Sequence, residues 1–221
     1  MLSDSPPERD VIWTEDGVRG AARFTQRLWR LIGEAAPHLP PPGTSFDSPD
    51  PAAVKTLRMQ THQTLAAVSE EIERLKFNTA VAKIYAFVNT LDAVIDEAGE
   101  RFASDQGYAA AAREAFDILV QIVAPMMPHL AEECWKVLGH EGLVAQESWP
   151  RVDPALLVED TVTLPVQING RKRAEVTVRR DATVPEIEQA ELQLDAVRQA
   201  LGGKPPKKVI VVPQRIVNVV A

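Results

Sequence analysis

The stretch TVTLPVQINGRKRAEVTV, residues 161–178, marks the point where the sequence pattern changes from helical to β-rich. Two segments rich in β-branched residues flank Asn169-Gly170, and this dipeptide between such segments is the strongest short signal of a two-residue hairpin turn. Three cations, Arg171 to Arg173, follow the turn directly. We therefore predict a β-hairpin with a basic tip.

The residues after the hairpin complete a small α+β domain. Thr183-x-x-Glu186 is a capping-box pattern and predicts one helix that continues to about Leu201. The segments KKVIVV and RIVNVV then predict two further strands. The expected order of elements is ββαββ over residues 159–221.

The residues before the hairpin predict an antiparallel bundle of five helices over residues 17–158. In each helix, apolar residues recur at three- and four-residue spacing, which is one face of an α-helix. The expected helices start near Gly17, Ala52, Asn78 (as a cap), Tyr108 and Pro128. A polar loop is expected from Gly99 to Gly107. Residues 1–16 are expected to be a linker, so the fold class is multi-domain, α plus α+β.

The charge differs between the two predicted domains. The 221 residues carry a net charge of −7, with 24 Lys and Arg against 31 Asp and Glu. Residues 1–159 hold 14 of the cations and 24 of the acids, which gives −10, and residues 160–221 hold 10 and 7, which gives +3. This change of sign indicates two modules with different partners.

Composition narrows the class of protein. Apolar residues make up 45% of the chain, enough to build a hydrophobic core. No apolar run approaches the roughly 20 residues of a membrane span, and the first ten residues lack the pattern of a secretory signal. Cys134 is the only cysteine, so no internal disulfide can form. We expect a cytoplasmic protein that does not contact a membrane.

Four arginines share one side of the first predicted helix. Arg19, Arg23, Arg27 and Arg30 fall within an arc of roughly 80°, opposite the apolar side chains. Many amphipathic helices have a solvated polar face of this kind. Guanidinium groups also bind phosphate through paired hydrogen bonds. Both interpretations stay open, a solvated face and a contact to a nucleic-acid backbone.

The cations of the C-terminal domain form a second candidate site. They are Arg171, Lys172, Arg173, Lys204, Lys207, Lys208 and Arg215. Alternation along a strand predicts that Arg171 and Arg173 share one face and that Lys172 lies on the other. Protection of strand edges is the alternative explanation. Residues 160–221 contain no aromatic side chain on which single-stranded bases could stack. A basic surface of this composition favours recognition of folded RNA through phosphates and shape.

Catalytic and metal-binding patterns are weak. His129, Glu132, Glu133 and Cys134 crowd one short helix, yet carboxylate-bridged metal sites in bundles need Glu-x-x-His motifs on two helices. We expect Cys134 to be a buried thiol. The other histidines, His38, His62 and His140, stand alone in the sequence. We therefore predict no metal site, no cofactor and no catalytic residue within these 221 residues.

Several segments, taken in order, resemble one family. GAARFTQRLWRL (20–31), FNTAVAKI (77–84), APMMPHLAEECW (124–135) and WP (149–150) resemble the helical anticodon-binding domain of class I aminoacyl-tRNA synthetases. VQINGRKRAEVTV and KKVIVVPQRIVNVV resemble the C-terminal domain of bacterial leucyl-tRNA synthetases, and SDSPPERDVIW resembles the segment just past their catalytic core. The resemblance covers nearly the whole chain, and the ordered set is specific.

The resemblance implies a non-catalytic, monomeric fragment of a leucine–tRNA ligase that binds tRNA(Leu). The ligase attaches leucine in an ATP-dependent reaction, and its ATP and Mg²⁺ would belong to the missing N-terminal catalytic portion, for which the fragment is also a partner. Arg23 and Arg27 match the family's positions on the first helix, and Arg171 and Arg173 match its hairpin. The competing hypothesis is a helical protein-interaction scaffold with an incidental basic C-terminal domain. A third, a metal enzyme at His129 and Cys134, is open to metal analysis.

Overall fold

The computed structural model divides into two compact units, Met1–Leu157 (unit 1) and Val158–Ala221 (unit 2). It describes residues 5, 8–10, 12–158, 161–179, 182–201, 206, 208–212 and 215–220. Each unit has its own hydrophobic core, and each is described by itself.

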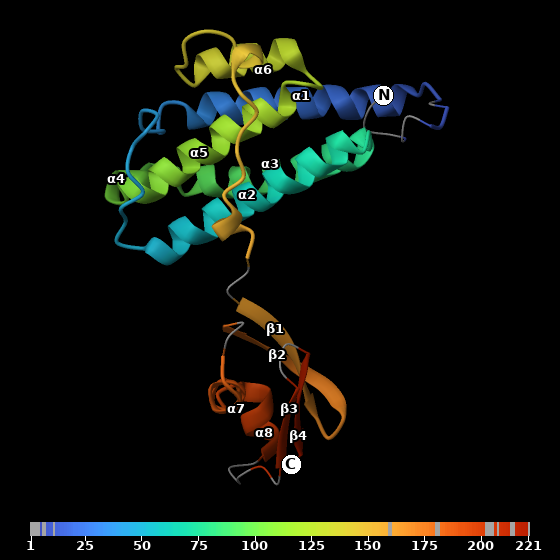
Figure 1. Ribbon diagram of the computed structural model, residues 1–221, viewed down its shortest axis with the longest axis vertical. Coiled ribbons are helices and arrows are strands. Elements are labelled where there is room, and N and C mark those ends of the chain that lie inside the picture. Colours follow the sequence, from blue (N-terminus) through green and yellow to red (C-terminus); the bar gives the residue numbers. More distant parts are fainter. Residues whose placement is uncertain are drawn as a thin grey trace. The chain divides into compact units, whose positions relative to one another are not determined.

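Unit 1 is helical (Figure 1). Its elements are α1 (Glu15–Ala35), α2 (Pro51–Glu73), α3 (Phe77–Asp96), α4 (Ala98–Ser104), α5 (Gln106–Val123), α6 (Pro128–Val137) and two 3₁₀ turns, η1 (Val144–Gln146) and η2 (Pro154–Leu156). Side chains that cap backbone N–H groups define three of the helix starts. The Thr14 hydroxyl accepts from Gly17 N at 3.2 Å, the Asp50 carboxylate from Ala53 N at 3.1 Å, and the Asp105 carboxylate from Tyr108 N at 2.9 Å.

Two local predictions for unit 1 are wrong. The expected polar loop between Gly99 and Gly107 contains α4, whose Phe102 side chain is buried in the core and so holds the short helix in place. Asn78 is no cap, since it lies inside α3, and Lys76 occupies the N-cap position without a side-chain hydrogen bond. Helix α3 therefore depends on burial of its apolar face and less on a capping interaction.

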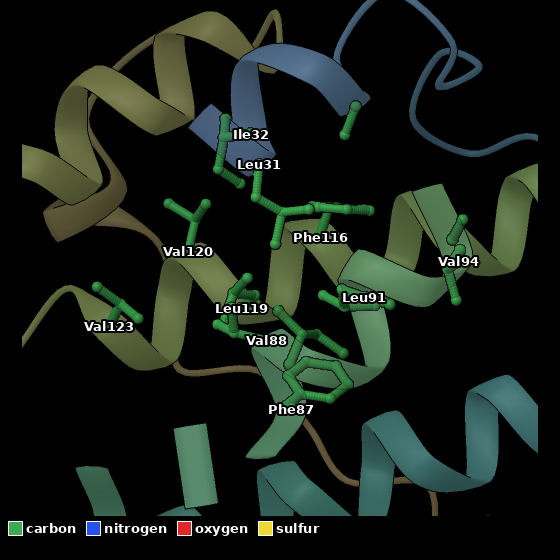
Figure 2. Close-up of a cluster of buried hydrophobic side chains, with 14 of the residues drawn as sticks. Leu31, Ile32, Phe87, Val88, Leu91, Val94, Phe116, Leu119, Val120 and Val123 are labelled. Carbon is green, nitrogen blue, oxygen red and sulfur yellow. The ribbon is translucent and has the colours of Figure 1, made fainter. Parts of the chain in front are cut away.

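The core of unit 1 lies where α1, α3 and α5 meet (Figure 2). Leu31 and Ile32 of α1 face Phe116 and Val120 of α5, and side chains of α3 close the cluster from below. Helix α5 is buried over most of its circumference, because alanines at 109–112 and 115 let neighbouring helices approach closely. The helix is thus the central element around which α2, α3, α4 and α6 pack.

Unit 2 is a four-stranded mixed sheet with two helices. Its elements are β1 (Thr161–Ile168), β2 (Arg171–Arg179), α7 (Val184–Leu192), α8 (Asp195–Leu201), β3 (Lys208–Val212) and β4 (Ile216–Val220). The strand order is β2-β1-β4-β3, with both hairpins antiparallel and β1 parallel to β4. The predicted β1–β2 hairpin around Asn169-Gly170 is present, with both turn residues at positive φ.

The single helix predicted between the strand pairs is in fact two helices. The helix is interrupted at Gln193 and Leu194, so the order of elements is ββααββ. In one continuous helix Arg198 would follow Glu191 on the buried face at seven-residue spacing, and Val197 would point sideways. The break rotates the chain so that Val197 is fully buried and Arg198 is exposed. Burial of Val197 therefore overrides the helical continuity that the sequence pattern favours.

The helices cover one face of the sheet and form its core. Valines on β1, β2 and β4 pack there against Ile187 and Val197. The side chains of the opposite face are mostly exposed; they include Thr163, Glu175, Lys208 and Ile210. We call this opposite surface the open face of the sheet.

Candidate nucleic-acid interface

Three of the four arginines of α1, Arg19, Arg23 and Arg30, are exposed, and two of these are paired. Arg19 contacts Glu15 at 3.1 Å and Asp16 at 3.5 Å, and Arg30 contacts Glu34 at 3.8 Å. These pairs are exposed, so each contributes little to stability and can exchange its carboxylate for another anion. Arg23 is exposed and has no ion-pair partner among the described residues. Of the four, Arg23 is thus the most accessible to a phosphate.

Arg27 differs from the other three because it is part of the packing of the bundle. Its Nε donates to the Asp92 carboxylate of α3 at 2.8 Å, and Nη2 donates to the same oxygen. The two side chains are only 33% and 30% exposed, so water screens this pair less than the pairs at the helix ends. The pair joins α1 to α3, and its geometry gives Arg27 a structural role.

Replacing Arg27 by methionine is expected to destabilise unit 1 by about 1–2 kcal/mol, because it leaves the half-buried Asp92 carboxylate without its partner. The melting temperature should fall by about 2–8 °C. Arg23→Met on the same helix is the matched control and should stay within about 0.5 kcal/mol of the parent. Thermal unfolding followed by tryptophan fluorescence measures both, and equal melting temperatures would contradict the structural role of Arg27.

A β-bulge decides which faces the hairpin cations occupy. The pairs across the hairpin are Val166 with Ala174, Gln167 with Lys172, and Ile168 with Arg171. Arg173 is therefore the extra residue of a bulge in β2. Directly opposite residues share a face, so Lys172 lies with Gln167 on the open face and Arg171 lies with Ile168 on the core side. Arg173 precedes core-side Ala174 and so joins Lys172 on the open face. The predicted pairing of Arg171 with Arg173 on one face is wrong, because the bulge interrupts the alternation.

The three hairpin cations are exposed at the end of the sheet. Lys172 Nζ contacts the Glu175 carboxylate at 2.6 Å on the open face, in a pair that is more than half exposed. Arg171 and Arg173 have no ion-pair partner among the described residues. Two unpaired guanidinium groups thus flank one paired lysine at the hairpin tip.

Lys208 joins the hairpin cations at the same end of the sheet. It begins β3 and pairs with Val220 at the end of β4. The Asn169 N–H donates to the carbonyl of Val219 at 2.9 Å, so this end of β4 adjoins the hairpin turn. Three strand spacings separate β3 from β2, or about 14 Å. We call Arg171, Lys172, Arg173 and Lys208 the basic sheet end.

The remaining predicted cations are not part of the basic sheet end as the structure describes it. Arg215 is exposed but lies in the turn from β3 to β4, next to the Val212–Ile216 pair at the opposite end of the sheet. Lys204 and Lys207 lie outside the described residues. The structure therefore gathers four of the seven cations predicted in unit 2, over a span comparable to a few phosphate spacings.

Two polar clusters in unit 1 escaped the sequence analysis. His62 of α2 is buried and contacts Glu114 of α5, which Arg58 also binds at 2.7 and 3.2 Å. Arg113 is buried too, and it contacts Asp117 and His140. Neither histidine stands alone, contrary to expectation, because each partner is distant along the chain. A polar residue at a core position was the only signal in the sequence.

The ionisable groups of these clusters take part in structure. Burial would raise the pKa of Glu114, but hydrogen bonds from His62 and Arg58 outweigh it, and the pKa lies below its usual range. Cys134 is buried, as predicted, and burial, with a smaller contribution from Glu133, raises the pKa of its thiol to about 11. Among the described residues no three His, Cys, Asp or Glu side chains are grouped to hold a metal ion. Within the same residues, no helix combines the length and hydropathy of a membrane span.

Known proteins resemble the chain over its full length. The family described as "Anticodon-binding domain of tRNA ligase" matches residues 55–189. The leucine–tRNA ligase of Rhodopseudomonas palustris (strain BisB18) is 60% identical over 221 residues, and that of Afipia carboxidovorans is 62% identical over 224; each comparison covers 100% of this chain and 25% of the relative. The chain thus spans about a quarter of the length of these curated relatives.

One solved structure is similar in fold. It is the ternary complex of Agrobacterium radiobacter K84 agnB2 LeuRS with tRNA and LeuAMS. The TM-score is 0.67 at 26% sequence identity, and the match covers 99% of this chain and 28% of that one. The match therefore includes both the helical unit and the sheet unit.

Proposed function

Because the chain belongs to the family of anticodon-binding domains of tRNA ligases, we propose that it is the tRNA-binding part of a leucine–tRNA ligase and has no catalytic site of its own. Relatives that are 54–62% identical over the whole chain are leucine–tRNA ligases, which supports leucine as the amino acid of the proposed ligase. The solved relative is a complex that contains tRNA, which supports tRNA as the ligand of this chain.

The basic sheet end is the observation that carries the proposal. It places two guanidinium groups without carboxylate partners among the described residues beside two lysines, in the more positive part of an acidic chain. Phosphates of folded RNA suit such a surface, since it offers charge and hydrogen-bond donors without aromatic stacking. Arg23 of α1 is the proposed contact in unit 1, whereas Arg19 and Arg30 would first have to leave their acidic neighbours. Lys204, Lys207 and Arg215 complete the proposed tRNA-binding set in unit 2.

In the full ligase these contacts would position tRNA(Leu), so that its acceptor end reaches a catalytic site on the rest of the protein. Holding a reactant in the right geometry lowers the barrier of the chemical step. Leucine, ATP and Mg²⁺ would bind in that other portion. We assign residues 17–158 to the anticodon-binding bundle and residues 159–221 to the C-terminal tRNA-binding domain. We further propose that the ligase is cytoplasmic and monomeric.

Exposed apolar side chains near the start of the chain fit a contact with the rest of the ligase. Ile12 and Trp13 precede α1 and are 82% and 69% exposed, and Trp29 on α1 is 46% exposed. Adjacent exposed apolar side chains such as Ile12 and Trp13 fit an interaction site. Trp29 lies about four helical turns farther along α1 and is a separate exposed side chain. The relatives extend far beyond the length of this chain, so the proposed occupant is another part of the same protein.

Binding of tRNA(Leu) by the 221-residue chain is expected to depend steeply on salt. About four phosphate contacts give a slope near −4 in a plot of log affinity against log salt concentration, or a loss of about 100-fold between 50 and 200 mM. Titrations at several salt concentrations measure the slope, with a non-leucine tRNA for comparison. A slope near zero, or a partner protein retained from nuclease-treated lysate while tRNA does not bind, would favour the interaction scaffold.

A further inference from the structure

The last nine residues of unit 1, 149–157, are attached to α2 by specific hydrogen bonds. We call them the exit segment, because they lead to unit 2. The Trp149 indole N–H donates to Ser69 Oγ at 2.9 Å, and the Asp153 backbone N–H donates to His62 Nδ1 at 3.1 Å. Leu156 in η2 is buried, which adds an apolar contact. Few backbone hydrogen bonds hold this irregular stretch, so its side-chain anchors matter.

His62 can accept the Asp153 N–H in only one state of its ring. A nitrogen that accepts a hydrogen bond carries no proton, so the ring is neutral and its proton resides on Nε2. That Nε2 lies 3.3 Å from the Glu114 carboxylate and donates to it. The hydrogen bond from Nε2 to Glu114 thus favours the tautomer with its proton on Nε2. In that tautomer, Nδ1 has a lone pair that can accept the Asp153 N–H.

The Glu114 carboxylate, which accepts from His62 Nε2, is itself held in place by Arg58. Arg58 donates to both carboxylate oxygens, and its guanidinium lies over the Phe46 ring at 4.1 Å from the centroid. His62 is 3% exposed, so neither the ring nor its bonds compete with bulk water. The lone pair of Nδ1 therefore points at a defined place on the surface of the bundle, where the exit segment docks.

We propose that His62 is a positioning residue: through Nδ1 it fixes the exit segment on the bundle and so keeps the tether of unit 2 short. With the segment docked, only residues 158–160 connect Leu157 to the first residue of β1. With the segment released as far as Trp149, residues 150–160 become the tether. The choice between the two lengths sets how far unit 2 can move from unit 1.

The tether length has a consequence for binding, and this part rests on the proposed function. When two linked modules bind one ligand, and the linker is long enough to span both sites, the effective concentration of the second module falls roughly as the −3/2 power of linker length. Lengthening the tether from three residues to eleven would weaken tRNA binding by up to about sevenfold. His62 would thus affect tRNA affinity without contacting RNA.

Two substitutions of His62 separate its two hydrogen bonds. In His62→Asn the side-chain oxygen takes the place of Nδ1, which keeps the bond to Asp153 and loses the bond to Glu114. In His62→Gln the terminal amide takes the place of Nε2, which keeps Glu114 and loses Asp153. Both remove the imidazole from the same buried position, so a purely structural role predicts the same behaviour for both.

Two measurements on the full chain test the proposal. Amide hydrogen exchange over residues 150–157 should be at least about fivefold faster in His62→Gln than in the parent, and close to the parent in His62→Asn. Spin labels at Gln60→Cys on α2 and Gln189→Cys on α7 report the distance between the units. Native Cys134 stays unlabelled because it is buried and its thiol pKa is raised. The distance distribution should broaden in His62→Gln and not in His62→Asn.

Equal distributions in parent and His62→Gln overturn the proposal, as do equal changes in the two variants. If His62→Gln fails to fold, Ser69→Ala, which removes the acceptor of the Trp149 indole, should broaden the distribution by a smaller amount, and no change there overturns it too. Affinity for tRNA(Leu) separates the two claims. A parent chain that does not bind tRNA contradicts the proposed function, while the distance measurement still decides the role of His62.

Discussion

Replacing Arg171 and Arg173 together by glutamate is expected to weaken binding of tRNA(Leu) about 100-fold or more near 0.1 M salt. Each lost phosphate contact costs about eightfold at this concentration, and the new carboxylates repel the RNA in addition. The substitution also changes the net charge of residues 160–221 from +3 to −1, since each reversal removes two charges. The salt slope should fall by about two units, which a titration series measures directly.

The control for this prediction must change the same charge elsewhere. Arg74→Glu with Lys136→Glu fits, because both side chains are exposed and neither belongs to the proposed tRNA-binding set. Arg113 would be a poor choice, since it is buried and bound to Asp117. Amide exchange of β1 and β2 should be unchanged in the hairpin variant. Equal losses of affinity in the two double variants would count against the basic sheet end and leave only a general effect of net charge.

Glu191→Gln is expected to stabilise unit 2 above pH 7 and to have little effect near pH 4. Glu191 is fully buried in the core beneath the sheet, and neither carboxyl oxygen has a hydrogen-bond partner among the described residues. Burial, together with the nearby charge of Glu188, raises the pKa of Glu191 from 4.5 to about 7. The folded state therefore retains a proton that the unfolded chain has already released.

The sign of the pH dependence follows from this difference. Well below pH 4.5 the Glu191 carboxyl is protonated in both the folded and the unfolded state, so its ionisation does not lower the free energy of unfolding of unit 2. Between pH 4.5 and 7 the unfolded chain binds fewer protons, so the stability of unit 2 falls as pH rises, and above pH 7 the penalty levels off at up to about 3 kcal/mol. Glutamine has the shape of the neutral acid, so it should remove most of this penalty.

Hydrogen exchange of β1 and β4 amides at pH 4 and pH 8 measures the effect on unit 2. Tryptophan fluorescence cannot, since all four tryptophans are in unit 1. Glu188→Gln, a half-buried neighbour on the same helix, should change stability by less than about 0.5 kcal/mol. If Glu191→Gln lowers stability at pH 8, the carboxylate is paired with a cation outside the described residues, and the expected penalty does not exist.

Features that depend on neighbouring residues could be predicted from the sequence. The hairpin turn needs only Asn169-Gly170, because both positions must adopt positive φ and these residues tolerate it. The start of α6 needs only Pro128, which suits the first turn. The pattern changes from helical to β-rich near Thr161, and the chain divides into its two units between Leu157 and Val158. Arg19, Arg23 and Arg30 lie on the exposed side of α1, whereas Arg27 is half-buried.

Features that depend on residues far apart along the chain could not be predicted from the sequence. The bulge at Arg173 arises where β2 must match β1, and it moves Arg173 from the face of Arg171 to the face of Lys172. Helix α4 exists because Phe102 reaches a core built by other helices. Arg27 pairs with Asp92, 65 positions along the chain, and so lost its predicted freedom to bind phosphate. Cations on one helix face look alike in sequence, and only packing distinguishes them.

By itself, the sequence determined the change from helices to strands, most of the elements, and the concentration of positive charge after residue 160, but not α4 or the break between α7 and α8. These follow from periodicity, capping and turn preferences, which act over a few residues. The tertiary structure alone decided which cations remain accessible, that the hairpin cations meet Lys208 at one sheet end, and that His62 holds a segment 91 positions away. Such outcomes require side chains to compete for space, partners and water, and that competition takes place only once the chain has folded.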